Sequence, residues 1–83
     1  MRYLLFIAEW SKASLETRDL FKNFMSDVPL TVIPLETQPS SHEEYAIRRL
    51  PTLVRLVDER EDGRSVAVDL VELFNFVKEK SDE

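Results

Sequence analysis

The chain alternates short apolar runs with longer segments whose apolar residues recur every three or four positions. Leu4–Ala8 is a continuous apolar run, which predicts a strand buried on both faces at the centre of a sheet. The segment from Ser11 to Ser14 offers serine hydroxyls that can cap a helix. The segment Leu15–Met25 has helical spacing, and its apolar side contains Leu20, Phe21, Phe24 and Met25.

The middle of the chain predicts a second strand and a short helix. Leu30–Ile33 is rich in β-branched residues, and Pro34 limits further pairing of this strand. Ser40 or Ser41 can cap a helix that runs to about Arg49. A proline disfavours helical backbone in the residue before it, so this helix ends before Pro51.

The last third of the chain predicts a hairpin followed by a helix. Thr52–Val57 alternates like a strand, Asp58–Gly63 is a charged turn, and Arg64–Val68 is a second antiparallel strand. Asp69 can cap a helix over Leu70–Lys80. The apolar face of that helix contains Leu70, Leu73, Phe74 and Val77. We expect residues 81–83 to form a frayed tail.

The predicted order of elements is therefore β-α-β-α-β-β-α. A helix between the first two strands implies that they pair in parallel, and the hairpin adds antiparallel strands. A chain of 83 residues has room for one domain only. We predict a single α/β domain over residues 1–80, with a mixed four-stranded sheet and three helices.

Charge and hydropathy narrow the classes of partner. Acidic residues number 16 against 11 basic ones, which gives a formal net charge of −5. A negative surface repels phosphates, so we expect no nucleic-acid partner. No apolar run is long enough to cross a bilayer, and the first apolar run reaches Glu9 too soon for a signal peptide. We expect a cytoplasmic protein without a membrane partner, as a monomer or weak dimer.

The residues that commonly bind metals are few. The chain has no cysteine and a single histidine, His42. Disulfides, thiolate metal sites and a cysteine nucleophile are therefore excluded, and one histidine alone forms no structural metal site. We expect no metal and no cofactor. We interpret His42 as a surface residue, and Glu43 with Glu44 as a solvated helix face, because adjacent helical carboxylates do not converge.

A small basic patch is predicted near the second helix. Arg48 and Arg49 are adjacent, and Arg55 follows on the next strand. We expect partial pairing of this patch with Glu43 and Glu44, which would contribute little stability.

Helical spacing divides the phenylalanines of the two longer helices between core and surface. It places Phe21, Phe24 and Phe74 in the core. Phe76 lies off the apolar face of the last helix, and two interpretations stay open: it packs against a neighbouring loop, or it is an exposed candidate contact residue.

Several of these residues resemble the thioredoxin family. The stretch from Phe6 to Ser14 contains Ala-Glu-Trp, which in thioredoxins precedes the active-site Cys-Gly-Pro-Cys. The resemblance extends without a gap from Arg2 to Val57. Its further matching residues are Gln38-Pro39, Tyr45, Ile47-Arg48 and Pro51-Thr52-Leu53. This resemblance implies a minimal thioredoxin-like fold in which a cis peptide bond precedes Pro51.

Three departures from thioredoxins change the expected chemistry. Ser11 and Ser14 stand at the two cysteine positions, Leu5 stands at the position of the buried acid, and the N-terminal strand and helix of thioredoxins have no counterpart. Disulfide exchange needs a thiolate that attacks a sulfur, which a serine hydroxyl cannot replace. The resemblance therefore implies a redox-inactive member, and we interpret Ser11 and Ser14 as helix-capping vestiges of the active site.

Apart from the two reactive cysteines, the resemblance includes the surface with which thioredoxins bind their clients. In redox members of the family the loop before the proline faces the first helix and pairs with an extended client peptide. We therefore predict a non-catalytic module that binds a protein partner in a groove between these two segments. The candidate contact residues are Trp10, Lys12, Ala13, Leu50, Pro51 and Thr52.

Two alternatives stay open at this point. The chain could be a thiol–disulfide oxidoreductase whose two cysteines have been exchanged for serine. Leu30–Leu56 also resembles the KaiB family of clock proteins and the related N-terminal sensor domain of the clock kinase SasA. The shared residues are Val32-Ile33, Gln38-Pro39, Glu43-Glu44 and Pro51-Thr52-Leu53-Val54. Arg64 and Asp69-Leu70 also fall where that family has an Arg and an Asp-Leu before its last helix. That resemblance would imply a clock or stress regulator that binds partner proteins.

Overall fold

The structure is a computed structural model that describes residues 1–66 and 69–81. Within these residues the elements follow the predicted order. They are β1 (Arg2–Ile7), α1 (Lys12–Phe24), β2 (Leu30–Pro34), α2 (Pro39–Glu44), β3 (Thr52–Val57), β4 (Arg60–Ser65) and α3 (Leu70–Ser81). None of these helices has the length and apolar character needed to cross a bilayer.

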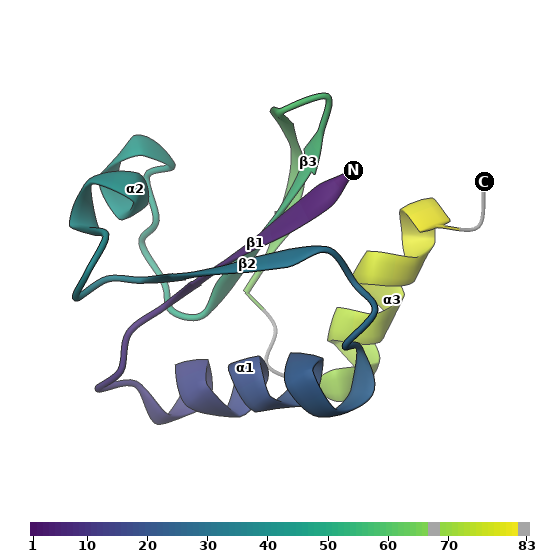
Figure 1. Cartoon of the computed structure of the whole chain (residues 1–83), viewed down its shortest axis with the longest axis horizontal. Coiled ribbons are helices and arrows are strands. Elements are labelled where there is room, and N and C mark those ends of the chain that lie inside the picture. Colours follow the sequence, from purple (N-terminus) through teal and green to yellow (C-terminus); the bar gives the residue numbers. More distant parts are fainter. Residues whose placement is uncertain (67–68, 82–83) are drawn as a thin grey trace.

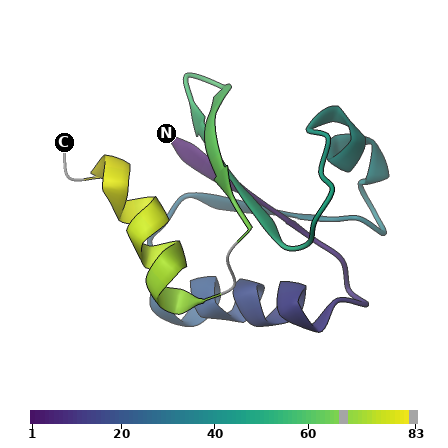
Figure 2. The same ribbon diagram turned by 180° about the vertical axis from the view of Figure 1, so that it is seen from behind.

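The strands of the described chain form one mixed sheet in the order β2-β1-β3-β4. β1 pairs in parallel with β2 and antiparallel with β3, and β3 pairs antiparallel with β4. Helices α1 and α3 lie on one face of the sheet and α2 lies on the other (Figures 1 and 2). The predicted fold class, an α/β domain with a mixed four-stranded sheet and three helices, is confirmed.

The core is built around β1, whose residues from Tyr3 to Ile7 are buried, as is Ala8. Successive side chains of a strand point to opposite faces. One cluster, on the α1 and α3 face, contains Tyr3, Leu5, Ile7, Phe21, Met25, Leu53 and Leu73. The other, on the α2 face, contains Leu4, Phe6, Ile33, Val54 and Leu56. A central strand buried on both faces is what the apolar run predicted.

Helix α1 begins at Lys12, three residues before the predicted start. Its buried stripe continues through Ser14, Thr17 and Phe21, which are spaced by three or four residues. Phe24 lies beside this stripe and is 64% exposed, so its predicted core position is wrong. Residues lie on both sides of an apolar stripe along a helix. The spacing of apolar residues does not decide which of these two sides packs against the sheet.

The same ambiguity affects α3, where the predicted core position of Phe74 is wrong. Leu73 is buried, but Phe74 is 47% exposed. Phe76 instead packs edge-on against Tyr3 with ring centroids 6.2 Å apart, and the guanidinium carbon of Arg55 lies 4.4 Å from its ring centre. The buried cation on the neighbouring strand draws this ring inward. The carboxylate of Asp69 accepts the amide of Val71 at 2.8 Å, as predicted for the cap of α3.

His42 is buried, contrary to its predicted surface position. Only 5% of it is exposed, and its ring lies edge-on to Phe6 with centroids 5.0 Å apart. Its Nε2 is 2.8 Å from the carbonyl oxygen of Ile33. A carbonyl oxygen only accepts, so Nε2 carries the proton. The histidine is therefore a satisfied core residue that fastens α2 to β2.

Helix α2 is shorter than predicted and ends at Glu44 instead of about Arg49. It begins after Gln38, with a proline in its first turn and no side-chain cap. The amide of Ile47 donates to His42 O at 2.9 Å and that of Ala46 to Glu43 O at 3.0 Å. These two bonds form a Schellman motif, which requires a left-handed residue. Ala46 has this conformation, with a φ of 52°.

The hairpin turn is shorter than predicted. It consists of Asp58 and Glu59, both left-handed with φ of 52° and 62°, as in the type I′ turn that suits the twist of paired strands. β4 therefore spans Arg60–Ser65 instead of Arg64–Val68, while residues 67 and 68 lie outside the described residues. An edge strand with exposed side chains accommodates charged residues, so this charge run forms a strand.

We expect Phe76 and Phe24 to differ in their contribution to stability. Phe76→Ala should lower the free energy of unfolding by about 2–3 kcal/mol, because it removes packing against Tyr3 and Arg55. Phe24→Ala should lower it by less than about 1 kcal/mol, because that ring is largely exposed. Urea denaturation of both variants measures the difference. Equal losses would contradict this assignment of core and surface.

The left-handed alanine that ends α2 predicts a stabilising substitution. Ala46→Gly should raise the free energy of unfolding by about 0.5–1 kcal/mol, because glycine adopts positive φ without steric cost. Glu16→Gly in the middle of α1 is the control and should lower it by a similar amount. Thermal unfolding measures both, and a fall in melting temperature for both variants would exclude a helix end set by Ala46.

Candidate functional site

The two segments predicted to form the site do meet at one end of the sheet. In the sheet register Thr52 lies opposite Phe6, so Pro51 lies beside the carboxyl end of β1. From there the chain continues through Trp10 and Ser11 into α1. The loop before β3 approaches the N-terminal end of α1 in both opposite views (Figures 1 and 2). The Leu50–Pro51 peptide bond is cis.

The hydroxyls of Ser11 and Ser14 are engaged in holding the start of α1. Ser11 is the N-cap, and its Oγ accepts the amide of Ser14 at 3.2 Å. Ser14 is fully buried, and its Oγ accepts the amide of Ala8 at 3.3 Å. Each hydroxyl thus satisfies a backbone donor that the end of a helix or strand would otherwise leave unpaired.

The other candidate residues range from exposed to buried. Trp10 is 73% exposed, and the side chain of Lys12 is 91% exposed, with its Nζ 3.9 Å from a carboxylate oxygen of Glu16. Ala13 and Leu50 are half-buried, while Pro51 and Thr52 are buried. The hydroxyl of Thr52 donates to Arg49 O at 2.6 Å and so fixes the loop. Trp10 and Lys12 are therefore the side chains that solvent reaches most freely.

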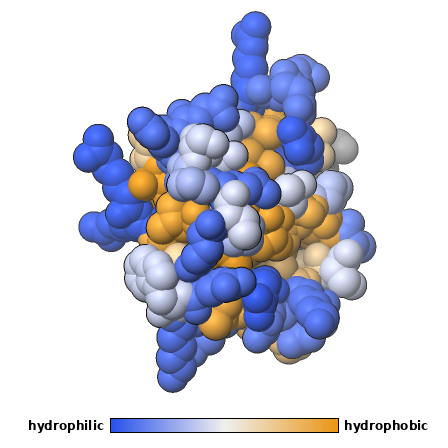
Figure 3. Space-filling model, turned by 60° about the vertical axis from the view of Figure 1, so that its left-hand side comes forward, coloured by the Kyte–Doolittle hydropathy of each residue, from blue (hydrophilic) through white to orange (hydrophobic). Residues whose placement is uncertain are grey.

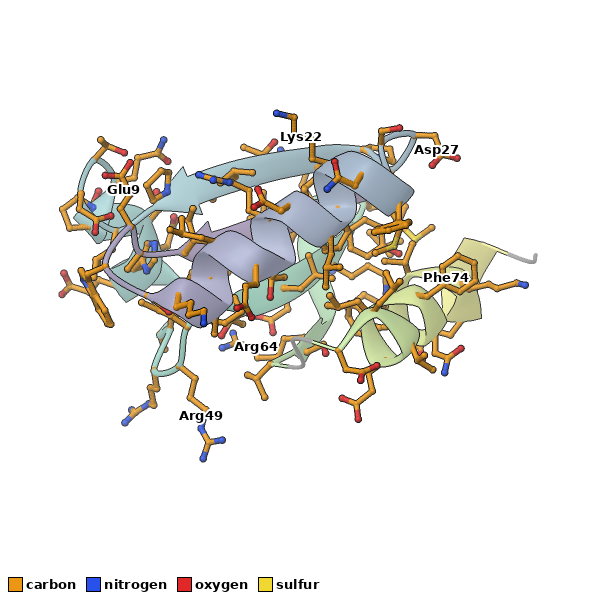
Figure 4. All side chains as sticks on the ribbon, turned by 90° about the horizontal axis from the view of Figure 1, so that it is seen from below. Glu9, Lys22, Asp27, Arg49, Arg64 and Phe74 are labelled. Carbon is orange, nitrogen blue, oxygen red and sulfur yellow. The ribbon has the colours of Figure 1, made fainter. Side chains whose placement is uncertain are left out.

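The loop that carries Trp10 is tied to the segment after β2. The amide of Glu9 donates to Oε2 of Glu36 at 2.9 Å, and the amide of Leu35 donates to Ile7 O at 2.8 Å. These contacts position the indole without covering it. Figure 4 shows Glu9 at this end of the molecule, far from the end that carries Phe74. The sequence did not indicate this tie, because Glu36 is one carboxylate among many.

Two of the three arginines predicted to form a basic patch lie together in the structure. Arg48 and Arg49 are exposed, and the described residues provide neither with an ion pair, so their predicted pairing with Glu43 and Glu44 is not formed. Arg49 projects from the loop beside the start of α1 (Figure 4). These two cations therefore border the candidate site.

Arg55 lies apart from this patch, beneath α3, and is only 3% exposed. It donates to Asp62 Oδ2 at 3.1 Å, to Glu79 Oε1 at 2.9 Å and to Phe76 O at 3.0 Å. Burial by itself would lower the pKa of Arg55, but hydrogen bonds to Glu79 and Asp62 raise it above its ordinary value. This residue joins the hairpin to α3 and has no part in the candidate site.

Within residues 1–66 and 69–81 no group of three or more histidine or carboxylate side chains is placed to hold a metal ion. Three cavities formed by these residues lie elsewhere. They are lined by α1, α3, β2, the segment that leads into β2 and, in one of them, Met1 and Tyr3. The arrangement around Trp10 is an exposed surface, with the indole itself 73% exposed.

Comparison with known proteins places the fold. No protein-family model matches the chain, and no curated protein matches it. Solved structures do match. A thioredoxin pre-protein from Schistosoma mansoni superimposes with a TM-score of 0.83 and 16% identity, over 93% of this chain and 75% of that one. A thioredoxin from Malassezia sympodialis gives a TM-score of 0.80 and 19% identity, over 95% and 73% of the two chains.

A solved structure of a shorter thioredoxin chain matches over its whole length. Thioredoxin 1 from Thermosipho africanus has a TM-score of 0.61 and 22% identity, covering 96% of this chain and 100% of that one. Likeness at such identities shows the fold alone. The chain has a minimal thioredoxin-like fold.

We expect removal of the two buried hydroxyls of α1 to have opposite effects on the free energy of unfolding. Ser14→Ala should lower the free energy of unfolding by about 1–2 kcal/mol, because the amide of Ala8 loses its acceptor. Thr17→Val should raise it by about 1 kcal/mol, because the buried Oγ1 of Thr17 has no hydrogen-bond partner. Thermal unfolding of both variants tests this, and changes of the same sign would contradict it.

Proposed function

We propose that this protein is a non-catalytic module that binds a partner protein through the surface around Trp10. The observation that carries the proposal is an indole 73% exposed, held beside two serines whose hydroxyls are committed to the backbone. The proposed contact residues are Trp10, Lys12, Ala13, Leu50, Pro51 and Thr52. Tryptophan is enriched among the few residues that supply most of the energy of an interface.

The chemistry of the serines supports a role without catalysis. A helix N-terminus lowers the pKa of a cysteine thiol from about 8.5 toward 7 or below, which produces a nucleophile. A hydroxyl has no such accessible anion, and it forms no mixed disulfide. Ser14 is moreover buried and bound to Ala8, so its oxygen is not presented to a substrate. We also propose a cytoplasmic location and a monomer or weak dimer in the absence of the partner.

The alternative, a thiol–disulfide oxidoreductase with both cysteines exchanged for serine, is favoured by the thioredoxins among the structural matches. The natural gene at codons 11 and 14 discriminates between the two, since cysteine codons would favour this alternative. The resemblance to KaiB has no observation of the structure in its support and stays a prediction from the sequence.

Absence of redox activity is tested directly by insulin reduction. We expect the chain to produce no turbidity above the background given by dithiothreitol alone, because it has no thiol to relay electrons. Thioredoxin from any source serves as the positive control. Turnover that rises with the concentration of this chain would overturn the proposal.

The binding surface is tested with a partner captured from the native host and then purified. Trp10→Ala should weaken the measured affinity about 30-fold, the effect of losing 2 kcal/mol at an interface hot spot. Phe24→Ala is the matched control, because it removes an exposed aromatic ring at the other end of α1. Equal affinity of the Trp10 variant and the unchanged chain would place the interface elsewhere.

A further inference from the structure

β2 forms one edge of the sheet, and part of its backbone faces outward. The amide of Tyr3 donates to Pro29 O at 2.9 Å, and the amide of Leu35 donates to Ile7 O at 2.8 Å. Backbone groups alternate in direction along a strand. Residues 29, 31, 33 and 35 therefore face β1, while Leu30 and Val32 direct their amide and carbonyl groups away from it. Figure 1 views the sheet from this side, with β2 in front of β1.

The opposite edge of the sheet is protected and β2 is not. β4 has the sequence Arg-Glu-Asp-Gly-Arg-Ser, and a bulge shifts its register opposite Arg55 and Leu56. Charged side chains and bulges discourage pairing of an edge strand with another chain. β2 has the sequence Leu-Thr-Val-Ile-Pro, and only Pro34 at its end opposes pairing. β2 is thus the edge to which a further strand can be added.

An open cavity of about 370 Å³ lies between this edge and α1. Its apolar lining consists of Phe21, Met25, Val28, Leu30 and Val32. A strand added beside β2 would direct every second side chain toward this cavity. The backbone of β2 would supply hydrogen bonds, and the cavity would select apolar side chains at alternate positions. Elsewhere on the surface, Figure 3 shows apolar patches between projecting polar side chains on the side that lies at the left in Figure 1.

The charged residues that line this cavity are both basic. They are Arg18 and Lys22 of α1, and no acidic residue lines it. Lys22 projects on the side of β2 (Figure 4). Arg18 is only loosely paired, at 3.5 Å from Asp19. The net charge of −5 opposes an acidic partner at a distance, but salt screens interactions beyond about 8 Å, so the adjacent cations dominate at contact.

We propose that the outer edge of β2 binds an extended, acidic segment of a partner protein as an additional strand. Apolar side chains of the segment occupy the cavity at alternate positions, and a carboxylate lies against Lys22 and Arg18. A second copy of this chain fits poorly, because symmetric pairing of two β2 strands would bring the four cations together. The cavity lies beside Leu30 and Val32, whereas Trp10 follows the carboxyl end of β1.

The test uses two synthetic peptides, each with alternating valine and threonine, one with glutamate and the other with lysine at both ends. Peptide is titrated into the isotope-labelled chain and followed by NMR. We expect the glutamate peptide to shift the amide signals of Leu30 and Val32, and to bind about five to ten times more tightly than the lysine peptide.

Charge-reversal variants assign this preference to the cavity. Lys22→Glu should abolish it or invert its sign, because the cation beside the added strand becomes an anion. Arg60→Glu, which changes the net charge equally but lies on β4, should preserve it. Circular dichroism of both variants establishes that they are folded.

Three results would overturn the proposal. The first is no binding of the glutamate peptide at millimolar concentration, and the second is a set of shifted signals around Trp10 and Pro51 instead of β2. The third is a concentration-dependent protection of Leu30 and Val32 in the peptide-free chain, which would make a second copy the occupant. The first and third results leave the proposed function around Trp10 untouched, and the second would favour it, so failure here is distinguishable from failure of the proposed function.

Discussion

Burial of β1 on both faces is the constraint on which the rest of the structure depends. Its residues from Tyr3 to Ile7 belong alternately to the two hydrophobic clusters. A fully buried large apolar side chain contributes about 1.5–3 kcal/mol, so five of them contribute about 10 kcal/mol, comparable to the whole stability of a typical domain. With no strong alternative core in so short a chain, α1, α2 and α3 all pack against this one strand and its neighbours.

The same strand positions the candidate site. Its carboxyl end leads into Ala8, whose amide is accepted by Ser14 and whose carbonyl accepts the amide of Ser11 at 3.0 Å. The start of α1 is therefore fastened to the end of β1, and Trp10 is left outside the resulting junction. Serine suits both positions because its hydroxyl accepts a backbone amide, and a buried polar oxygen that has made its hydrogen bond has a structural role. Trp10 is exposed because it lies outside this ordered junction.

Buried polar groups complete the fold where the apolar core ends. Arg55 joins the hairpin to α3, and His42 joins α2 to β2. An uncompensated buried charge costs several kcal/mol, so the carboxylates of Asp62 and Glu79 are required beside the guanidinium. These contacts specify where the helices lie. The sheet edge formed by β2 lacks any such cover, and it differs in this respect from the charged and bulged edge formed by β4.

The order of strands and helices, the central position of β1, the cap at Asp69 and the strand Thr52–Val57 could all be predicted from the sequence, because local periodicity and capping chemistry determine them. The end of α2 at Glu44, the turn at Asp58 and Glu59, and the burial of His42 could not. The chain lacks glycine at those turns, and the neighbours of His42 along the chain are polar. Phe24 and Phe74 lie outside their predicted core positions for a related reason. Helical spacing defines a stripe but not which flank meets the sheet, and only the tertiary position of Arg55 and Tyr3 decides that. For the candidate site, the sequence determined which residues adjoin Trp10 along the chain, and the thioredoxin resemblance implied that the loop before Pro51 faces them. The tertiary structure decided how the two segments meet, because the register of β1 against β3 places Pro51 beside the carboxyl end of β1.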